Sequence, residues 1–389
     1  MTYKKPELLI PASSLEVLKT AVMFGADAVY IGGEAFGLRA KAKNFSSEEM
    51  AEGVAFAHAH GVKVYVTANI LAHNYDLDGA RKYFAELRDM KPEQPDALII
   101  SDPGMFMIAK EVWPQVEVHI STQANNTNYE TYLFWWKLGA KRVVSARELS
   151  LVEIKGIREK IPAEMEIESF VHGAMCISYS GRCLLSNFFT GRDANRGACT
   201  HPCRWKYAVV EETRPGEYLP VYENERGTYI FNSKDLCMIE HIPELIEAGI
   251  DSFKIEGRMK KAEYAAGVTS VYRKYIDRYF QVGREGYRVD KKDLDFLSSL
   301  YIRSQIQDGY YYKQNGADMI TLNSPAYNGS EESVLKRIRE TYIDVPAEKK
   351  KKAPVSMEIT LHVGKPAAFR VKVLQTEREI FLTGPEVDK

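Results

Sequence analysis

The sequence predicts an α/β protein: a TIM-type (β/α)8-like barrel with a cysteine-rich loop after its seventh strand and a small β-rich C-terminal domain. Two observations predict the barrel. Short β-branched runs alternate with helical stretches, and eight such units fill roughly the first 280 residues. A third observation, four cysteines gathered between residues 168 and 207, predicts the loop. An open, doubly wound sheet is the competing architecture.

Each predicted strand is a short apolar run bounded by turn or helix signals. Because nearly every run is followed by a helix, the pattern indicates right-handed βαβ units and a parallel sheet. The strands are expected at residues 7–12, 27–33, 63–69, 96–102, 117–123, 142–147, 165–172 and 251–257. The helices are expected at residues 14–25, 46–61, 77–90, 103–112, 129–138, 149–160, 231–248 and 261–279, and the start SSEE of the second predicts a capping box.

The composition along the chain predicts three parts. Residues 1–285 are expected to form the barrel, with the cysteine loop at 173–207. Residues 286–346 are polar and tyrosine-rich and are expected to be a helical or irregular connector, with one helix near residues 330–341. After the charged linker AEKKKK, residues 347–389 alternate apolar and polar side chains, which predicts a small β domain that is part of a longer one.

The overall composition indicates an ordinary globular protein, with 45% hydrophobic and 27% charged residues among 389. The net charge of −1 excludes a strongly basic surface, so contact with nucleic acid must come from a local patch. We find no secretory signal and no apolar run of membrane-spanning length, and therefore expect a cytoplasmic protein without membrane contact. In a reducing compartment, clustered cysteines favour metal or redox chemistry over disulfides.

Four of the five cysteines follow the spacing C-x6-C-x15-C-x3-C: Cys176, Cys183, Cys199 and Cys203. Three interpretations remain open: a [4Fe–4S] cluster, a structural zinc ion, or unconnected buried thiols. Cys237 lies in a stretch with helical periodicity, so core packing is its expected role. Arginines of the same loop either meet phosphates or pair with nearby carboxylates; they are Arg182, Arg192, Arg196 and Arg204.

Polar side chains gather at the predicted strand ends, where a barrel of this type places its site. They include Asn69, Gln123, Arg147, Glu168, His172, Lys254, Glu256 and Arg258. Two interpretations remain open. Lys254 and Glu256 neutralise Glu168 and Arg147 in a structural network, or the cations form a pocket for an anionic small molecule, which Arg147 and Arg258 grip bidentately.

The stretch ESFVHGAMCISYSGRCLLS, from Glu168 to Ser186, closely resembles the signature of peptidase family U32, the collagenase-like peptidases. PELLIPA, GADAVYIGG, STQ at 121–123 and DSFKIEGRMK at 251–260 resemble the same family, so that the resemblance covers about residues 5–280. The sequence is most similar to the prephenate-dependent tRNA hydroxylation branch, which makes 5-hydroxyuridine at the anticodon wobble position. Sister branches hydroxylate a cytidine of large-subunit ribosomal RNA or assist oxygen-independent ubiquinone synthesis.

The resemblance implies an iron–sulfur protein that hydroxylates tRNA, or ribosomal RNA or a quinone precursor. It implies that Cys176, Cys183, Cys199 and Cys203 bind a [4Fe–4S] cluster and that prephenate is a co-substrate. The family name keeps peptide hydrolysis as an alternative, although the sequence contains no triad, HExxH motif or aspartyl pair. A non-catalytic cluster carrier is a third class, and the sequence does not determine the oligomeric state.

Prephenate is a small dicarboxylate, so the cations at the strand ends are candidates to bind it. We expect Arg147, Lys254 and Arg258 to hold the carboxylates. Gln123 and Asn69 are expected to line the same pocket, and either Glu168 or His172 is expected to transfer protons.

Overall fold

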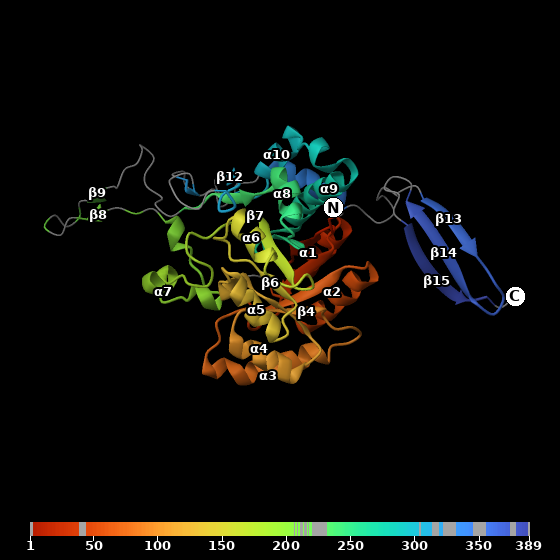
Figure 1. Ribbon diagram of the computed structural model, residues 1–389, viewed down its shortest axis with the longest axis horizontal. Coiled ribbons are helices and arrows are strands. Elements are labelled where there is room, and N and C mark those ends of the chain that lie inside the picture. Colours follow the sequence, from red (N-terminus) through yellow and green to blue (C-terminus); the bar gives the residue numbers. More distant parts are fainter. Residues whose placement is uncertain are drawn as a thin grey trace. The chain divides into compact units, whose positions relative to one another are not determined.

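The computed structural model in Figure 1 describes most of the chain. The described residues are 3–38, 44–205, 207, 209, 210, 213, 216, 218, 219, 232–302, 305–312, 319–321, 332–344, 355–373 and 379–387. Contacts divide the chain into two compact units, Met1–Ile338 and Arg339–Lys389. Within the described residues, no helix combines the length and the apolar composition needed to cross a lipid bilayer.

Eight strands form a closed parallel barrel, which confirms the predicted fold class. Each strand from β1 to β7 pairs with the next, and β11 closes the barrel by pairing with both β7 and β1. The competing open sheet is therefore wrong. The strands are β1 (Glu7–Pro11), β2 (Ala28–Gly32), β3 (Lys63–Ala68), β4 (Ala97–Ile100), β5 (Glu117–Ile120), β6 (Arg142–Val144), β7 (Glu166–Gly173) and β11 (Ser252–Ile255).

Helices surround the barrel, as Figure 1 shows for α1 to α6. The capping box predicted at the start of the second helix is confirmed, because Ser46 and Glu49 exchange side-chain-to-backbone hydrogen bonds there. The helices of the barrel are α1 (Leu15–Met23), α2 (Ser47–Ala59), α3 (Leu77–Arg88), α4 (Pro103–Val112), α5 (Tyr129–Lys137), α6 (Leu151–Arg158), α8 (Ile242–Glu247) and α9 (Ala262–Gly286).

The predicted helix over residues 231–248 is wrong in its first part. Asp235–Cys237 forms strand β10, which pairs antiparallel with the end of β7 and parallel with β12 (Ile306–Gln307). In a segment of three residues, the spacing of apolar side chains does not distinguish a strand from a helix. The strands that pair with β10 come from distant parts of the chain. Cys237 is nonetheless buried, and its sulfur lies 3.9 Å from the hydroxyl of Tyr272, in agreement with a packing role.

The later part of the chain contains shorter elements. Helix α10 (Lys291–Ser298) was not predicted, whereas α11 (Glu332–Ile338) falls within the helix expected near residues 330–341 and continues as a π-helix, Arg339–Ile343. The expected C-terminal β structure is confirmed as an antiparallel sheet of β13 (Val355–Thr360), β14 (Pro366–Val373) and β15 (Glu379–Glu386).

The cysteine loop follows β7 directly. It contains the short helix α7 (Leu185–Thr190) and the 3-10 turns η3 (Ala194–Arg196) and η4 (Pro202–Arg204). Strands β8 (Val209–Val210) and β9 (Tyr218–Leu219) pair antiparallel beyond it. The loop therefore starts where a parallel barrel places its functional residues, at the C-terminal end of a strand.

Candidate functional site

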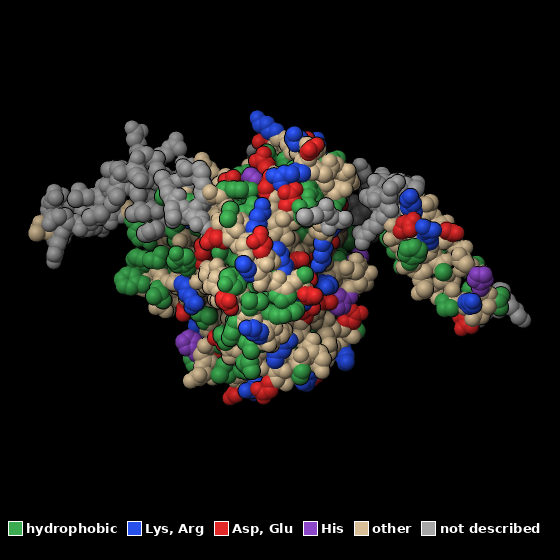
Figure 2. All heavy atoms as spheres, viewed as in Figure 1, with side chains coloured by type: hydrophobic (Ala, Val, Ile, Leu, Met, Phe, Trp, Pro, Cys, Tyr) green, Lys and Arg blue, Asp and Glu red, His purple; other side chains and the backbone are tan. Residues whose placement is uncertain are grey.

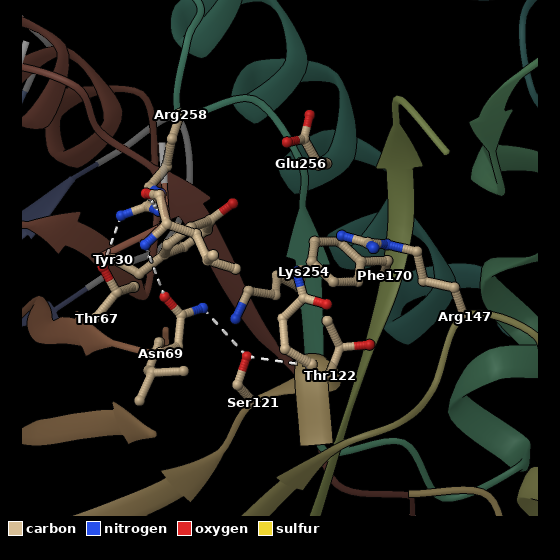
Figure 3. Close-up of a pocket in the computed structure, with 13 residues that line it drawn as sticks. Tyr30, Thr67, Asn69, Ser121, Thr122, Arg147, Phe170, Lys254, Glu256 and Arg258 are labelled. Atoms are coloured by element: carbon tan, nitrogen blue, oxygen red, sulfur yellow. Dashed lines mark hydrogen bonds between the residues drawn. The ribbon is translucent and has the colours of Figure 1, made fainter. Parts of the chain in front are cut away.

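A pocket opens at the C-terminal ends of the barrel strands (Figure 3), with about 460 Å³ of space including its mouth. The structure brings together five residues expected there: Asn69, Gln123, Arg147, Lys254 and Arg258. Glu256 also lines the pocket, whereas Glu168 and His172 are absent from its wall. The rest of the wall consists of Tyr30, Leu38, Thr67, Ile99, Ser121, Thr122 and Phe170.

Glu168 lies in a buried ion network with Lys254 and Arg142. Its side chain is fully buried, with Lys254 Nζ 2.5 Å from Oε1 and Arg142 Nη1 3.0 Å from Oε2. Burial by itself would raise the pKa of Glu168, but Lys254 and Arg142 outweigh burial and lower it. Glu168 is therefore an ionised anchor for Lys254, which presents to the pocket an ammonium group that is already paired.

Arg142 is the centre of this network and was not among the predicted residues. It is buried and also pairs with Glu7 and Glu166, in each case at 2.6 Å. The sequence did contain a signal for this network: Arg142 is the first residue of an apolar strand, and Glu7 and Glu166 are the first residues of two other strands. Lys254 and Glu168 therefore neutralise each other in a structural network, as one of the two interpretations expected. Arg142, which was not predicted, is part of the same network.

Arg258 is held by polar groups of the pocket wall (Figure 3). Its Nη1 donates to the hydroxyl of Thr67 at 2.6 Å, and its Nη2 donates to the carbonyl of Leu38. Asn69 accepts a hydrogen bond from the backbone N–H of Leu38 at 3.1 Å and donates to the hydroxyl of Ser121 at 3.2 Å. These bonds orient polar groups from β3 and from the segments after β2, β5 and β11 around one space.

Arg147 forms no ion pair with any described residue. Its guanidinium lies over the ring of Phe170, 4.6 Å from the centroid, and Nη1 is 3.9 Å from the sulfur of Cys176. Its Nε is buried without a hydrogen-bond partner among the described residues. An oriented guanidinium without an ion pair at the wall of a pocket is prepared to bind an anion such as a carboxylate.

His172 packs in the core between β7 and α9. Its ring makes an edge contact with Tyr272 at 5.4 Å between centroids, and Nδ1 lies 3.4 Å from the Tyr272 hydroxyl. The pairing of β7 with β11 shifts in register just before His172 pairs with Ile255. The regular alternation of side chains between the two faces of β7 is therefore interrupted at His172. Burial, with a smaller contribution from Lys260, lowers the pKa of His172 to about 3.

Replacing His172 with Gln is expected to reduce the loss of stability in acid. Between the ordinary pKa of 6.5 and the folded value of about 3, the unfolded chain binds more protons than the folded one. The free energy of unfolding therefore falls as the pH drops through this window, by up to about 1.4 kcal/mol per pH unit from this group. Urea titrations of both proteins across the window measure the difference, and parallel curves would contradict the assignment.

Several wall residues were not among the predicted ones, because only charged, amide and imidazole side chains at the strand ends were taken as candidates. Phe170 and Thr67 each lie two positions before a predicted residue, His172 and Asn69. Thr67 shares the face of Asn69 because alternate side chains point to the same face, whereas His172 turns away from the pocket and gave no such signal for Phe170. Tyr30, by contrast, is placed by a contact across the barrel, in which its hydroxyl donates to the carbonyl of Ile255 at 2.8 Å.

The four cysteines lie on the loop that borders the pocket, where Cys176 is 3.9 Å from Arg147. Cys176 is exposed, while Cys183, Cys199 and Cys203 are half-buried. Burial raises the pKa of Cys203 to about 11; Arg204 opposes this increase, and the three other thiols add to it. As they stand, no three His, Cys, Asp or Glu side chains of the described residues converge tightly enough to hold a single metal ion.

One backbone donor points toward a thiol of this group, and one side chain supports the loop backbone. The N–H of His201 donates to the sulfur of Cys199 at 3.4 Å, and the side-chain amide of Asn195 donates to the carbonyl of Cys183 at 3.0 Å. N–H donors to sulfur, with four soft ligands, are the surroundings that iron–sulfur clusters use. The chemistry of these four soft donors is therefore compatible with such a cluster.

The loop is fastened to the barrel at Gly181. Its φ is +72°, and a Cβ at this position would overlap the carbonyl oxygen of Gln123, a residue of the pocket wall. The hydroxyl of the neighbouring Ser180 donates to Glu148 at 3.1 Å. The same hydroxyl accepts a hydrogen bond from the backbone N–H of Arg147 at 3.4 Å. This close approach holds the start of the cysteine loop beside the pocket.

Replacing Gly181 with Ala is expected to destabilise the protein more than the same change at Gly191. Both glycines have positive φ, which costs an alanine about 1–2 kcal/mol, but Gly191 has no neighbour within 4 Å of an added Cβ. The overlap with Gln123 adds a cost only at Gly181. Denaturant titration measures both variants, and equal losses would show that the loop does not depend on this approach.

A second, larger hollow adjoins the pocket on the side of the cysteine loop, with about 1530 Å³ of space including open solvent. Arg147 lines both spaces, and Cys176, Tyr179, Glu148 and Tyr310 line the outer one. The hydroxyl of Tyr310 donates to the carbonyl of Cys176 at 2.8 Å. A small molecule in the inner pocket and a larger one in the outer groove would thus meet at Arg147 and Cys176.

Comparison with known proteins gives a consistent set of relatives. Residues 13–321 match the model of peptidase family U32. The chain is 51% identical over 294 residues to tRNA hydroxylation protein P1 of Bacillus subtilis, covering 76% of this chain and 68% of the relative. It is 44% identical over 315 residues to tRNA hydroxylation protein P of Escherichia coli, covering 70% and 68%.

A more distant relative is the 23S rRNA 5-hydroxycytidine synthase of Escherichia coli, 33% identical over 342 residues, covering 87% of this chain and 50% of the relative. Among solved structures, a U32 peptidase superposes with a TM-score of 0.43 at 15% identity, covering 66% of this chain and 94% of that one.

Proposed function

This chain belongs to peptidase family U32, and from that membership we propose that it is an RNA-modifying enzyme that hydroxylates tRNA. The finer proposal is prephenate-dependent formation of 5-hydroxyuridine at the anticodon wobble position, with a [4Fe–4S] cluster on the cysteine loop. The names of relatives at 51% and 44% identity support tRNA over ribosomal RNA, whose named enzyme is 33% identical.

One observation carries the proposal: Arg147 forms part of the barrel pocket and reaches to 3.9 Å from the sulfur of Cys176. A bound anion and the cysteine site are therefore within reach of the same side chain. Peptide hydrolysis would instead need an activated nucleophile or water. The buried imidazole of His172 has a pKa of about 3 and does not line the pocket, so it offers no base there.

The pocket offers two kinds of group to a small dicarboxylate. Arg147 would bind one carboxylate, and Lys254 and Arg258, held by Glu168 and Thr67, would provide a positive wall for the other. Asn69 and Gln123 would bind hydroxyl or carbonyl oxygens of the same molecule. In this proposal Glu168 positions Lys254.

The four loop cysteines would hold the cluster. Without a metal, the raised pKa of Cys203 keeps its thiol protonated, and binding to iron would stabilise the thiolate form. When bound, such a cluster supplies electron transfer or a Lewis-acidic iron. Hydroxylation of a base removes two electrons, which a terminal oxidant must accept, and a cluster near the substrate would pass these electrons to that oxidant.

Iron, acid-labile sulfide and zinc are to be measured on protein purified without oxygen. We expect about four irons and four sulfides per chain in the wild type and in Cys237→Ala, and loss of both in Cys176→Ala. Cys237 is the matched control because it is the fifth cysteine, buried and outside the loop set. In parallel, nucleoside mass spectrometry of tRNA from a deletion strain carrying each variant reports 5-hydroxyuridine.

The outcomes separate the alternatives. One zinc without sulfide would overturn the cluster, and a deletion strain with unchanged 5-hydroxyuridine would overturn the tRNA assignment. Loss of 5-hydroxycytidine from ribosomal RNA in that strain would show that ribosomal RNA, and not tRNA, is the substrate. Cleavage of unfolded collagen by the metal-free protein would favour the peptidase alternative.

A further inference from the structure

Three aromatic rings of the cysteine loop form an exposed cluster, which we call the aromatic surface: Phe188, Phe189 and Trp205. Their exposed fractions are 81%, 45% and 38%. The ring centroids of Phe188 and Phe189 are 5.2 Å apart, and those of Phe189 and Trp205 are 5.9 Å apart. Figure 2 shows hydrophobic side chains gathered over this part of the molecule, at the end that carries α7 in Figure 1.

The aromatic surface stands on an anchored element. Ser186, on the same short helix, is fully buried, and its hydroxyl accepts from the backbone N–H of Thr200 at 3.0 Å. The hydroxyl of Thr190 donates to the carbonyl of Ser186 at 2.7 Å. Large apolar side chains held in solvent by an ordered backbone are typical of a binding surface.

The charge of the loop indicates the chemistry of the partner. Residues 174–207 contain five cations and a single carboxylate, Asp193, in a chain whose net charge is −1. Arg196 pairs with Asp76, and Arg204 is buried against backbone carbonyls and Asn232. Arg182 and Arg192 form no ion pair with any described residue, so their charge is available to a polyanion. The five cations are Arg182, Arg192, Arg196, Arg204 and Lys206.

The same loop leads to the site. Tyr179 is 67% exposed and lines the outer groove together with Cys176 and Arg147. Exposed rings interleaved with unpaired arginines are how proteins hold single-stranded nucleic acid, since bases stack on the rings and phosphates meet the cations. A protein partner would need an acidic surface to match the excess of cations over carboxylates, whereas every RNA is a polyanion.

We propose that the aromatic surface is a stacking platform for unpaired bases of an RNA loop, with Arg182 and Arg192 meeting its phosphates. This inference rests on the proposed function and names the surface through which the RNA substrate is held. Bases flanking the target stack on Phe188, Phe189 and Trp205, while the target nucleotide enters the outer groove beside Tyr179 and Cys176.

The test is the affinity of the anaerobic, full-length protein for a fluorescent tRNA anticodon stem-loop, compared with a fully paired RNA of equal length. We expect the stem-loop to bind more tightly, and Phe188→Ala with Phe189→Ala to weaken its binding about tenfold or more. Phe280→Ala, an exposed ring on α9, is the matched control and should bind as the wild type does. Arg182→Gln with Arg192→Gln should lower the dependence of affinity on salt.

Iron content is measured on every variant, so that damage to the cysteine site is detected separately. Unchanged stem-loop affinity in the double phenylalanine variant, with the wild type binding RNA, would overturn the inference and leave the proposed function standing. A wild type that binds neither RNA would overturn both. A variant that keeps its RNA affinity but changes its oligomeric state would make the aromatic surface a contact between copies of the chain.

Discussion

Replacing Arg147 with Ala is expected to lower the formation of 5-hydroxyuridine on the order of a hundredfold, because a hydrogen bond to a charged group contributes about 1.5–3 kcal/mol and about 1.4 kcal/mol corresponds to a factor of ten. The unpaired guanidinium over Phe170 is the group that the pocket offers to a carboxylate. Prephenate should raise the melting temperature of the wild type, and this shift should disappear in Arg147→Ala.

Arg147→Lys is the control, since it keeps the charge but loses the planar fork. It should retain part of the prephenate-dependent shift in melting temperature. The stability of both variants without prephenate should stay close to that of the wild type, because Arg147 has no ion pair to lose among the described residues. A full thermal shift by prephenate in Arg147→Ala would show that the anion binds elsewhere.

Replacing Arg142 with Met is expected to cost about 3–5 kcal/mol of unfolding free energy, the largest stability effect that we predict. The side chain is 3% exposed and lies against three carboxylates, those of Glu7, Glu166 and Glu168. Methionine fills the space but leaves these charges buried without their common partner. Denaturant titration at neutral pH measures the loss.

The matched control is Lys19→Met, which removes an ion pair with Glu52 at the similar distance of 2.7 Å on the surface. Because both partners are solvated, that change should cost about 1 kcal/mol or less. If both variants lose the same small amount, the buried network would not stabilise the barrel.

The pH dependence of stability gives a second measure of the same network. Burial would raise the pKa of Glu7, but Arg142 outweighs burial and lowers it to about 2, from an ordinary value of 4.5. Its contribution to stability is therefore complete above pH 4.5 and is lost as the pH falls toward 2. In Arg142→Met this part of the acid dependence should shrink.

The sequence by itself determined the order of the barrel elements and the cysteine set. Short apolar runs, caps such as Ser46 with Glu49, and glycine stops are local signals that hydrogen bonding and side-chain periodicity impose on neighbouring residues. The strand ends also identified Asn69, Gln123, Arg147, Lys254 and Arg258 before their meeting in one pocket was known, because parallel strands end on the same face of a barrel.

Only the tertiary structure decided which of these side chains form ion pairs with one another and which can contact a ligand. Glu168 meets Arg142 and Lys254 across β6 and β11, and His172 turns to α9 after a shift in register. The side of a strand follows from its own sequence, but the partner across the barrel depends on how distant strands are aligned. That alignment is set by closure of the whole barrel, which pairs Lys254 and leaves Arg147 facing the cysteine loop without an ion pair among the described residues.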